Sequence, residues 1–200
     1  MLPKPQDLNN TEARFGGGDG FSHLPSGIYV CVIKSVSAIV DNNAKVKEWL
    51  EYDYDIKDGE YAGYFEEQYK RMQTFTDMPN WYATARKYYT DKALPYFKGF
   101  IKRIIDSNPR FSIRDDYSGL AEKEIVLSIQ AVEKTSKAGK NYWRYDVKNE
   151  YSKKELAQGK DYNGKTLAKY EDKPLDNTAS GTTSTASSKE PPILEDDIQF

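Results

Sequence analysis

The chain has 200 residues, of which 38% are hydrophobic, and its 29 basic and 31 acidic side chains give a net charge of -2. This length suits one domain of modest size with tails. A single cysteine excludes an intramolecular disulfide, and one cysteine with one histidine cannot form a zinc cluster. No apolar run approaches the ~18 residues of a membrane span, and the N-terminus lacks an apolar signal segment. We therefore expect a protein of the reducing cytosol that holds no cofactor.

The excess of acidic over basic side chains lies at the C-terminal end. From residue 173 onward there are two basic and five acidic side chains, which leaves 27 basic and 26 acidic ones in residues 1–172. A body with almost no net charge remains compatible with nucleic-acid binding, because a local basic groove decides that property. The 16 tyrosines suit both β-sheets and a surface on which bases stack.

The N-terminal half predicts an arm and three strands. Residues 1–22 contain three successive glycines and little periodicity, which predicts a mobile arm. A turn at 24–27 precedes a β-branched run that predicts a strand over about 28–39. Residues 49–56 alternate, which predicts an apolar inner face and places Glu51, Asp53 and Asp55 on a solvated outer face. After the Asp58–Gly59 turn we expect a third strand over about 64–75.

The C-terminal half predicts helices followed by two strands. Pro79 is expected to open a helical stretch over 81–89, and the apolar spacing in 94–105 predicts an amphipathic helix. Alternation predicts strands over 124–132 and 141–147, joined by a glycine-containing hairpin loop at 136–140. A short helical turn is expected at 152–157, and 178–188 is a low-complexity linker.

This order of elements predicts a mainly β protein with an OB-fold-like five-stranded barrel and a helical insertion between strands 3 and 4. A Greek-key sandwich is the competing architecture. The expected organisation is a flexible arm (1–22), an OB-like domain (23–152), a C-terminal extension (153–172), a disordered linker (173–192) and an acidic tip (193–200).

Two motifs suggest catalysis, and we reject both. Residues 159–166 match the P-loop pattern G-x-x-x-x-G-K-[ST], but a P-loop must leave a buried strand and enter a helix, and neither is expected here. Asp55-Ile56-Lys57 and Glu171-Asp172-Lys173 match the D/E-x-K spacing of metal nucleases, which arises by chance in a highly charged chain. His23 lies in a loop without an evident partner. We predict no catalytic or metal-binding residues and no enzyme; a nuclease or nucleotide hydrolase is the weakest alternative.

Two segments combine aromatic rings with cations as single-strand binding requires, because bases stack on rings while cations contact the phosphates. The first covers the expected third strand and the segment after it, and the second is the last hairpin. For the aromatics of the first segment, packing onto the barrel is an equally good interpretation. The candidate DNA-binding residues are Tyr69, Lys70, Arg71, Trp81, Tyr82, Arg86, Lys87, Lys134, Lys137, Lys140, Tyr142 and Arg144.

The last eight residues, Ile193 to Phe200, place acids and apolar side chains at the end of a Ser/Thr-rich stretch. A terminal phenylalanine with no core to join is a candidate for a pocket on another protein, with the acids steering it toward a basic rim. The tip resembles the C-terminal tip of bacterial single-stranded-DNA-binding proteins, which recruits replication and repair enzymes, although Gln199 replaces the usual proline. The resemblance covers the candidate partner-binding residues Asp196, Asp197, Ile198 and Phe200. A merely solubilising tail is the alternative.

Segments 24–29, 58–63 and 134–144 resemble a phage family, once uncharacterised, of single-stranded-DNA-binding and recombination-associated proteins. The resemblance covers roughly residues 24–159. It implies an OB-fold, sequence-independent binding of single-stranded DNA during phage replication and recombination, and residence in the cytosol of the infected bacterium. It leaves open whether the protein is a homodimer. The alternative function is a protein-interaction factor that engages replication proteins without binding DNA.

Overall fold

The computed structural model describes residues 23–41, 48–74, 81–88, 90–113, 117–137 and 139–175. The expected N-terminal arm, most of the expected linker and the tip with Asp196, Asp197, Ile198 and Phe200 lie outside these residues.

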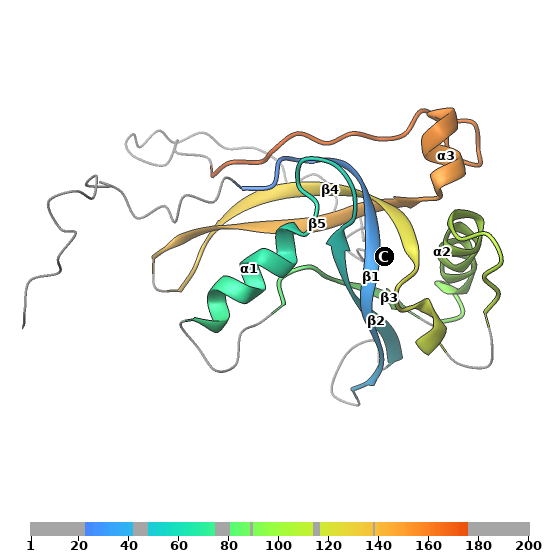
Figure 1. Ribbon diagram of the computed structural model, residues 1–200, viewed down its shortest axis with the longest axis horizontal. Helices are drawn as coiled ribbons and strands as arrows, with labels where there is room; N and C mark the ends of the chain where they lie inside the picture. The colour runs from blue at the N-terminus through green and yellow to red at the C-terminus, as the bar shows by residue number, and fades with distance from the viewer. Residues whose placement is uncertain are drawn as a thin grey trace, which may run out of the picture.

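Five antiparallel strands form the body of the protein (Figure 1). They are β1 (Gly27–Val40), β2 (Glu48–Ile56), β3 (Thr84–Tyr88), β4 (Glu124–Thr135) and β5 (Asn141–Tyr151), in the spatial order β3-β2-β1-β4-β5. The sheet curves into a nearly closed barrel, and the helix α2 (Leu94–Ser107) falls between β3 and β4. The predicted OB-fold-like barrel with its helical insertion is therefore confirmed.

The barrel interior follows from the alternation of apolar side chains along the strands. In β2, Leu50, Tyr52, Tyr54 and Ile56 are all buried, as predicted. The same is true in β4 of the alternate residues Ile125, Leu127, Ile129 and Ala131.

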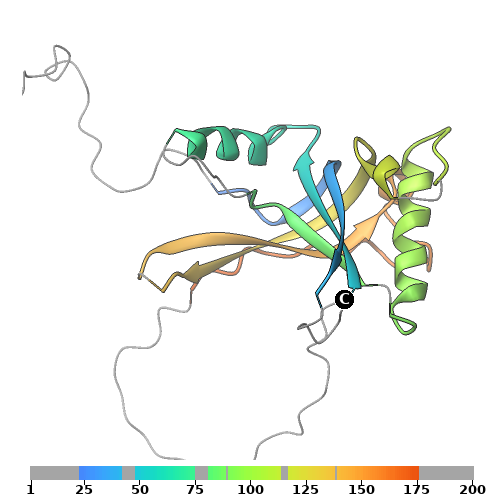
Figure 2. The same ribbon diagram turned by 90° about the horizontal axis from the view of Figure 1, so that it is seen from below.

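The barrel is closed at its seam by side chains. The described residues of β3 and β5 share no backbone ladder; instead Lys87 of β3 forms an ion pair with Glu150 of β5. The Lys87 ammonium also lies 5.5 Å from the ring centre of Phe100 on α2. Helix α2 buries Phe97, Phe100 and Ile104 in the common core, and it stands at one end of the barrel while the β4–β5 hairpin extends away from it (Figure 2).

The predicted third strand over 64–75 is wrong, because Tyr64–Gln73 forms the helix α1. Its sequence is rich in glutamate, glutamine, lysine and arginine, which favour helix. The buried carboxylate of Asp55 on β2 fixes where the helix begins: it accepts hydrogen bonds from the backbone N–H groups of Phe65 (3.0 Å) and Glu66 (3.1 Å). Asp55 is only 2% exposed, so its predicted place on a solvated face is also wrong.

The predicted helix over 81–89 is wrong as well, because Thr84–Tyr88 is the strand β3. It pairs with β2 from Trp49 opposite Tyr88 to Asp53 opposite Thr84. The segment before it joins the barrel through Trp81, whose indole N–H donates to the carbonyl of Tyr54 (3.1 Å). Pairing with β2 thus overrides the helical propensity of Ala85, Arg86 and Lys87.

The C-terminal extension crosses the outer face of the barrel. The predicted helical turn is the helix α3 (Lys153–Gln158), which begins with a capping box between Ser152 and Glu155. Leu156 and Leu167 then cover a second, smaller core that contains Val126 and Tyr151. We call residues 167–175 the strap, which runs along the top of Figure 1.

The strap ends beside β4 and the start of β1. Lys173 forms a parallel bridge with Val132 of β4 at a position that β1 does not reach, since the β1–β4 pairing ends at Gly27 opposite Ile129. The carboxylate of Asp172 accepts a hydrogen bond from the Ser26 N–H (2.5 Å) and lies 2.6 Å from His23 Nε2. His23 also stacks on Trp143, at 4.1 Å between ring centres. The prediction that His23 lacks a partner is wrong, because its partner is 149 residues away.

The Asp172 contacts predict an acid-sensitive strap. Partial burial acts to raise the pKa of Asp172, but the hydrogen bonds from His23 and Ser26 outweigh it and hold this pKa below its ordinary value. A lowered carboxyl pKa stabilises the fold above the unfolded-state pKa, and the stabilisation is lost as pH falls through the folded value. We expect Asp172→Asn to lower the free energy of unfolding by about 1–2 kcal/mol at neutral pH. The difference from wild type should shrink below about pH 4, as measured by urea unfolding. A difference that is constant with pH would contradict this account.

Candidate nucleic-acid interface

The β4–β5 hairpin presents the second group of candidate residues on one outer surface. In the antiparallel register Lys134 lies opposite Tyr142, and Arg144 lies two residues further along the same face of β5. Lys137 and Lys140 belong to the exposed loop between the strands. We call Lys134, Lys137, Lys140, Tyr142 and Arg144 the hairpin surface.

The loop of the hairpin is held by its own backbone. Ser136 donates from its N–H to the carbonyl of Lys140 (2.8 Å), and Gly139 donates to the carbonyl of Ser136 (2.9 Å). Gly139 has φ +76°, a conformation that glycine adopts without strain. The loop therefore holds the backbone of Lys137 and Lys140 in a defined turn.

The hairpin surface carries positive charge that the rest of the described structure neutralises only at Arg144. Residues 134–145 contain four basic and no acidic side chains. Arg144 forms an ion pair with Asp146 (2.8 Å), whereas Lys134, Lys137 and Lys140 have no carboxylate partner among the described residues. Tyr142 is 49% exposed, so its ring lies open beside these cations. Open rings and free cations are the two components of single-strand binding.

Most cations of the first candidate group are used within the fold. Lys70 pairs with Glu66 (2.7 Å) on the same helix, and Lys87 closes the barrel seam. Arg86 pairs with Glu51 (2.8 Å) and lies 5.0 Å from the ring centre of Trp49. These side chains stabilise local structure and are less available to phosphates than the hairpin lysines.

The aromatic residues of the first group also divide into those that pack within the fold and those that are exposed. Tyr69 packs against Trp81 with 5.5 Å between ring centres, and Trp81 is fixed to β2 by its indole hydrogen bond. Tyr82 is 53% exposed and Arg71 is also exposed. The structure thus brings together the hairpin residues as one surface, whereas the exposed members of the first group include Lys70 and Arg86, which are held in ion pairs.

The acidic outer face of β2 is largely occupied by internal contacts. Asp53 accepts hydrogen bonds from the hydroxyls of Ser35 and Thr84, each at 2.6 Å. Glu51 is paired with Arg86. These contacts reduce the repulsion that this face exerts on a phosphate chain, but they do not make it basic.

The rejected catalytic motifs have structural roles. Gly159 has φ +65° and ends α3, and the loop after it closes through a bridge between Lys160 and Thr166. The P-loop pattern therefore follows a helix and forms a tight turn. In Asp55-Ile56-Lys57, Asp55 caps α1 and Lys57 forms an ion pair with Glu124.

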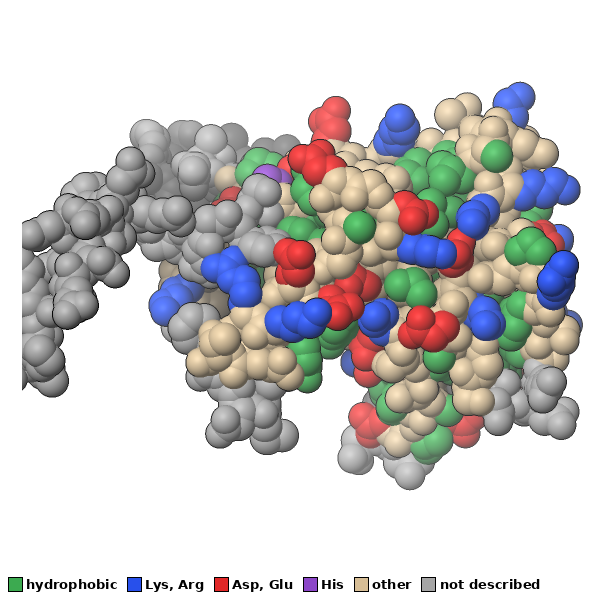
Figure 3. All heavy atoms as spheres, viewed as in Figure 1, with side chains coloured by type: hydrophobic (Ala, Val, Ile, Leu, Met, Phe, Trp, Pro, Cys, Tyr) green, Lys and Arg blue, Asp and Glu red, His purple; other side chains and the backbone are tan. Residues whose placement is uncertain are grey.

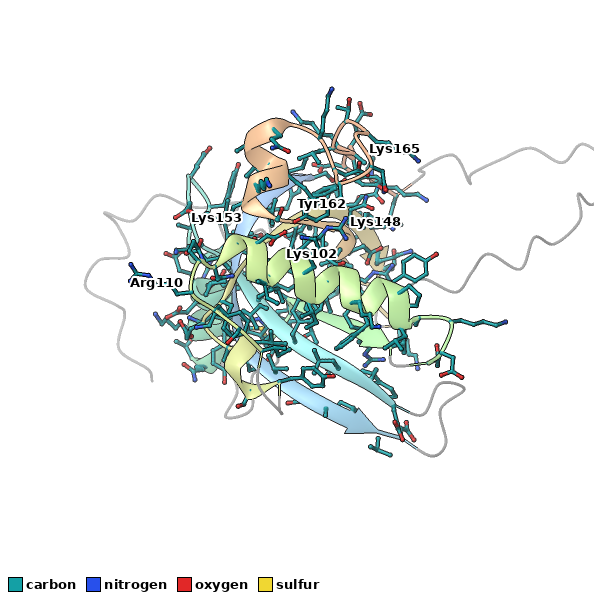
Figure 4. All side chains as sticks on the ribbon, turned by 90° about the vertical axis from the view of Figure 1, so that its right-hand side faces the viewer. Lys102, Arg110, Lys148, Lys153, Tyr162 and Lys165 are labelled. Carbon is teal, nitrogen blue, oxygen red and sulfur yellow. The ribbon has the colours of Figure 1, made fainter. Side chains whose placement is uncertain are left out.

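A second basic surface was missed by the sequence analysis. It consists of Tyr162 with Lys102, Lys153 and Lys165, which are labelled in Figure 4, and of Lys154 and Lys160, which are exposed in the same segment of the chain. We call it the α2–α3 surface. The density of lysine in 153–165 was the available signal, but the contribution of α2 depends on packing between distant segments.

Comparisons with known proteins give no family for this chain. No family model matches the sequence, and no curated protein matches it either. In the part of the chain that the structure describes, no helix is both long and apolar enough to cross a membrane. The same residues contain no group of three or more histidine, cysteine or acidic side chains placed to hold a metal ion.

Proposed function

We propose that this protein binds single-stranded DNA without sequence specificity, as a non-enzymatic factor of phage DNA replication and recombination in the cytosol of the infected bacterium. The observation that carries the proposal is the hairpin surface, where three lysines without a described carboxylate partner lie on the same hairpin as the exposed ring of Tyr142. In OB-folds the loop between strands 4 and 5 borders the oligonucleotide-binding surface, and the hairpin occupies that position in this barrel.

Binding would combine two contributions that do not read sequence. A base stacked on an aromatic ring contributes about 1–3 kcal/mol, and every base has a ring face that can stack on Tyr142. Contacts between Lys134, Lys137 and Lys140 and the phosphates would release counterions, so affinity should fall as salt rises. Neither contribution depends on the edges of the bases.

The C-terminal tip would recruit a protein partner. Its acidic residues would approach a basic rim, and the ring of Phe200 would fill an apolar pocket while the terminal carboxylate pairs with a cation. The strap supports a link between the two activities, because its last described residue, Leu175, donates its N–H to Glu133 (3.1 Å), next to Lys134 of the hairpin surface. The segment that leads to the tip therefore starts beside the proposed DNA contact.

The test is a titration of intrinsic fluorescence with oligo-dT at low and moderate salt, on the full chain and on a chain lacking residues 193–200. We expect quenching with micromolar or tighter affinity in both proteins, weaker at the higher salt concentration, because stacking and phosphate contacts reside in the barrel. Absence of binding in both proteins would overturn the proposal.

The alternative function is a protein-interaction factor that does not bind DNA. The nearly neutral body and the acidic outer face of β2 favour it. Absence of quenching in the titration, together with retained binding of a partner that needs Phe200, would establish this alternative.

A further inference from the structure

The side of the molecule formed by α2 and α3 is rich in lysine. Figure 3 shows basic side chains gathered at the right-hand edge, over these helices. Residues 153–169 contain five lysines and two acidic side chains, and all five lysines are exposed. A group of exposed cations is the usual signature of a surface that meets a polyanion.

The two acidic side chains of residues 153–169 are engaged in internal contacts. Glu155 is buried, caps α3 and forms an ion pair with Arg103 of α2 (3.2 Å). Asp161 accepts hydrogen bonds from the N–H groups of Asn163 and Lys165, each at 2.8 Å. Within the described residues, Lys154, Lys160 and Lys165 form no ion pair. Their charge is therefore directed to solvent.

Tyr162 is held rigidly at the centre of this surface. Its hydroxyl bonds to Asp106 and to the Ser152 hydroxyl (3.2 Å), and its backbone N–H donates to Glu155 (3.0 Å). The ring is nevertheless 42% exposed. The Lys102 ammonium lies 4.7 Å from its centre while it forms an ion pair with Asp106 (2.7 Å), and Figure 4 shows the Lys102 and Tyr162 side chains next to each other. A fixed, open ring with adjacent cations can accept a base and its phosphate without further ordering.

A polar pocket adjoins this surface at the end of α2. It has a volume of about 360 Å³, and Lys153 belongs to both the pocket and the surface. Lys153 is engaged with Glu124 (2.6 Å), whereas Arg110 and Lys123 have no ion-pair partner among the described residues. Arg110 has φ +74°, a strained conformation for a residue with a side chain and one that occurs preferentially at ligand sites. The lining also includes the acidic Glu122 and Glu124, so the pocket adds only a small excess of positive charge to this side of the molecule.

We propose that the α2–α3 surface is a second contact surface for single-stranded DNA, which a strand bound at the hairpin surface reaches by following the strap. The strap joins the two surfaces, because it runs from the Lys160–Thr166 bridge to the bridge between Lys173 and Val132. These ends are at most roughly 25 Å apart along an extended chain. Exposed Lys169 and Glu171 lie between them, and exposed Lys173 lies at the end beside β4. The inference rests on the proposed function and adds the path of the strand.

The experiment compares two lengths of DNA on the full chain with Lys160→Ala and Lys165→Ala combined. An oligo-dT of about 5 nucleotides should fill one surface, and one of about 30 nucleotides should reach both, because successive phosphates of a strand are about 3.4 Å apart and OB-fold site sizes are about 4–16 nucleotides. We expect the affinity for the long strand to fall about tenfold and that for the short strand to stay unchanged. For the long strand, the slope of log affinity against log salt concentration should become less steep by about 1.4, since each single-strand phosphate contact contributes about 0.7.

The charge-preserving variant with Lys160→Arg and Lys165→Arg is the matched control and should bind the long strand like wild type. If the alanine variant binds the long strand with wild-type affinity and slope, the inference is wrong and the surface serves another ligand, such as an acidic protein segment. If it loses affinity for both lengths equally, the α2–α3 surface is the primary site and the two-surface path is wrong. Failure of wild type to bind either strand would instead overturn the proposed function itself.

Discussion

Replacing Lys134, Lys137 and Lys140 together by alanine is expected to weaken binding to oligo-dT by about 10- to 100-fold at moderate salt. The three ammonium groups have no carboxylate partner in the described structure, so their removal costs phosphate contacts and breaks no described ion pair. The slope of log affinity against log salt concentration should become less steep by about 2, which is about 0.7 for each lost contact. Titrations at several salt concentrations measure both quantities.

The control replaces the same three residues by arginine, which keeps the charge and should keep most of the affinity. The thermal unfolding of both variants should match that of wild type, because exposed lysines without partners contribute little to stability. If the alanine variant binds oligo-dT as tightly as wild type, the hairpin surface is not part of the DNA-binding site.

Asp55→Ala is expected to lower the free energy of unfolding by about 2–4 kcal/mol. The carboxylate accepts from the N–H groups of Ile56 (2.8 Å), Phe65 and Glu66 in a buried position, and alanine would leave these donors without an acceptor. Each buried unsatisfied donor costs about 1–3 kcal/mol, partly recovered by relaxation of the first turn of α1. Urea unfolding followed by far-UV circular dichroism measures the loss.

Asp53→Ala is the matched control on the same strand. Among the described residues, the Asp53 carboxylate bonds only to the hydroxyls of Ser35 and Thr84 at the surface, so its loss should cost about 1 kcal/mol or less. Equal effects of the two substitutions would show that Asp55 does not hold α1 to the barrel.

Burial raises the pKa of Asp55 despite the opposing backbone hydrogen bonds and Lys34. Its carboxyl therefore favours folding most at acidic pH, and this contribution declines as pH rises through the folded pKa.

The strands with a buried face were predictable from sequence because alternation is a local property. Leu50 to Ile56 and Ile125 to Ala131 show it without interruption, and both strands formed as expected. Helix α2 was predictable for the same reason, through the spacing of Phe97, Phe100 and Ile104. In each case the spacing of the apolar residues identifies the face that packs into the core.

Helix α1 and strand β3 were exchanged in the prediction because their causes are not local. The first turn of α1 is capped by Asp55, from a different strand, and the rest of the helix is too exposed to show a clear apolar stripe. Strand β3 has only five residues and exists because it pairs with β2. Helix propensity alone would have identified Tyr64–Gln73, whereas the turn signal at Asp58–Gly59 led to the prediction of a strand after it.

The two basic surfaces also differ in whether a local sequence pattern could predict them. The hairpin surface follows from alternation on either side of a short turn, which places Tyr142 and Arg144 on one face of β5. The α2–α3 surface requires Arg103 to meet Glu155, 52 residues later, before Lys102 and Tyr162 come together. Contacts of that separation leave no trace in a local pattern.

The strap also has a consequence for the order in which the protein folds during synthesis. Strand β1 is made first, yet its neighbour β4 and the side chains that cover Ile28 and Val30, Leu156 and Leu167, follow roughly 100 or more residues later. Contacts of such large sequence separation fold slowly, and the apolar outer face of β1 stays uncovered in the nascent chain until the strap emerges. The strand at the centre of the sheet is thus the first to be synthesised and the last to be enclosed.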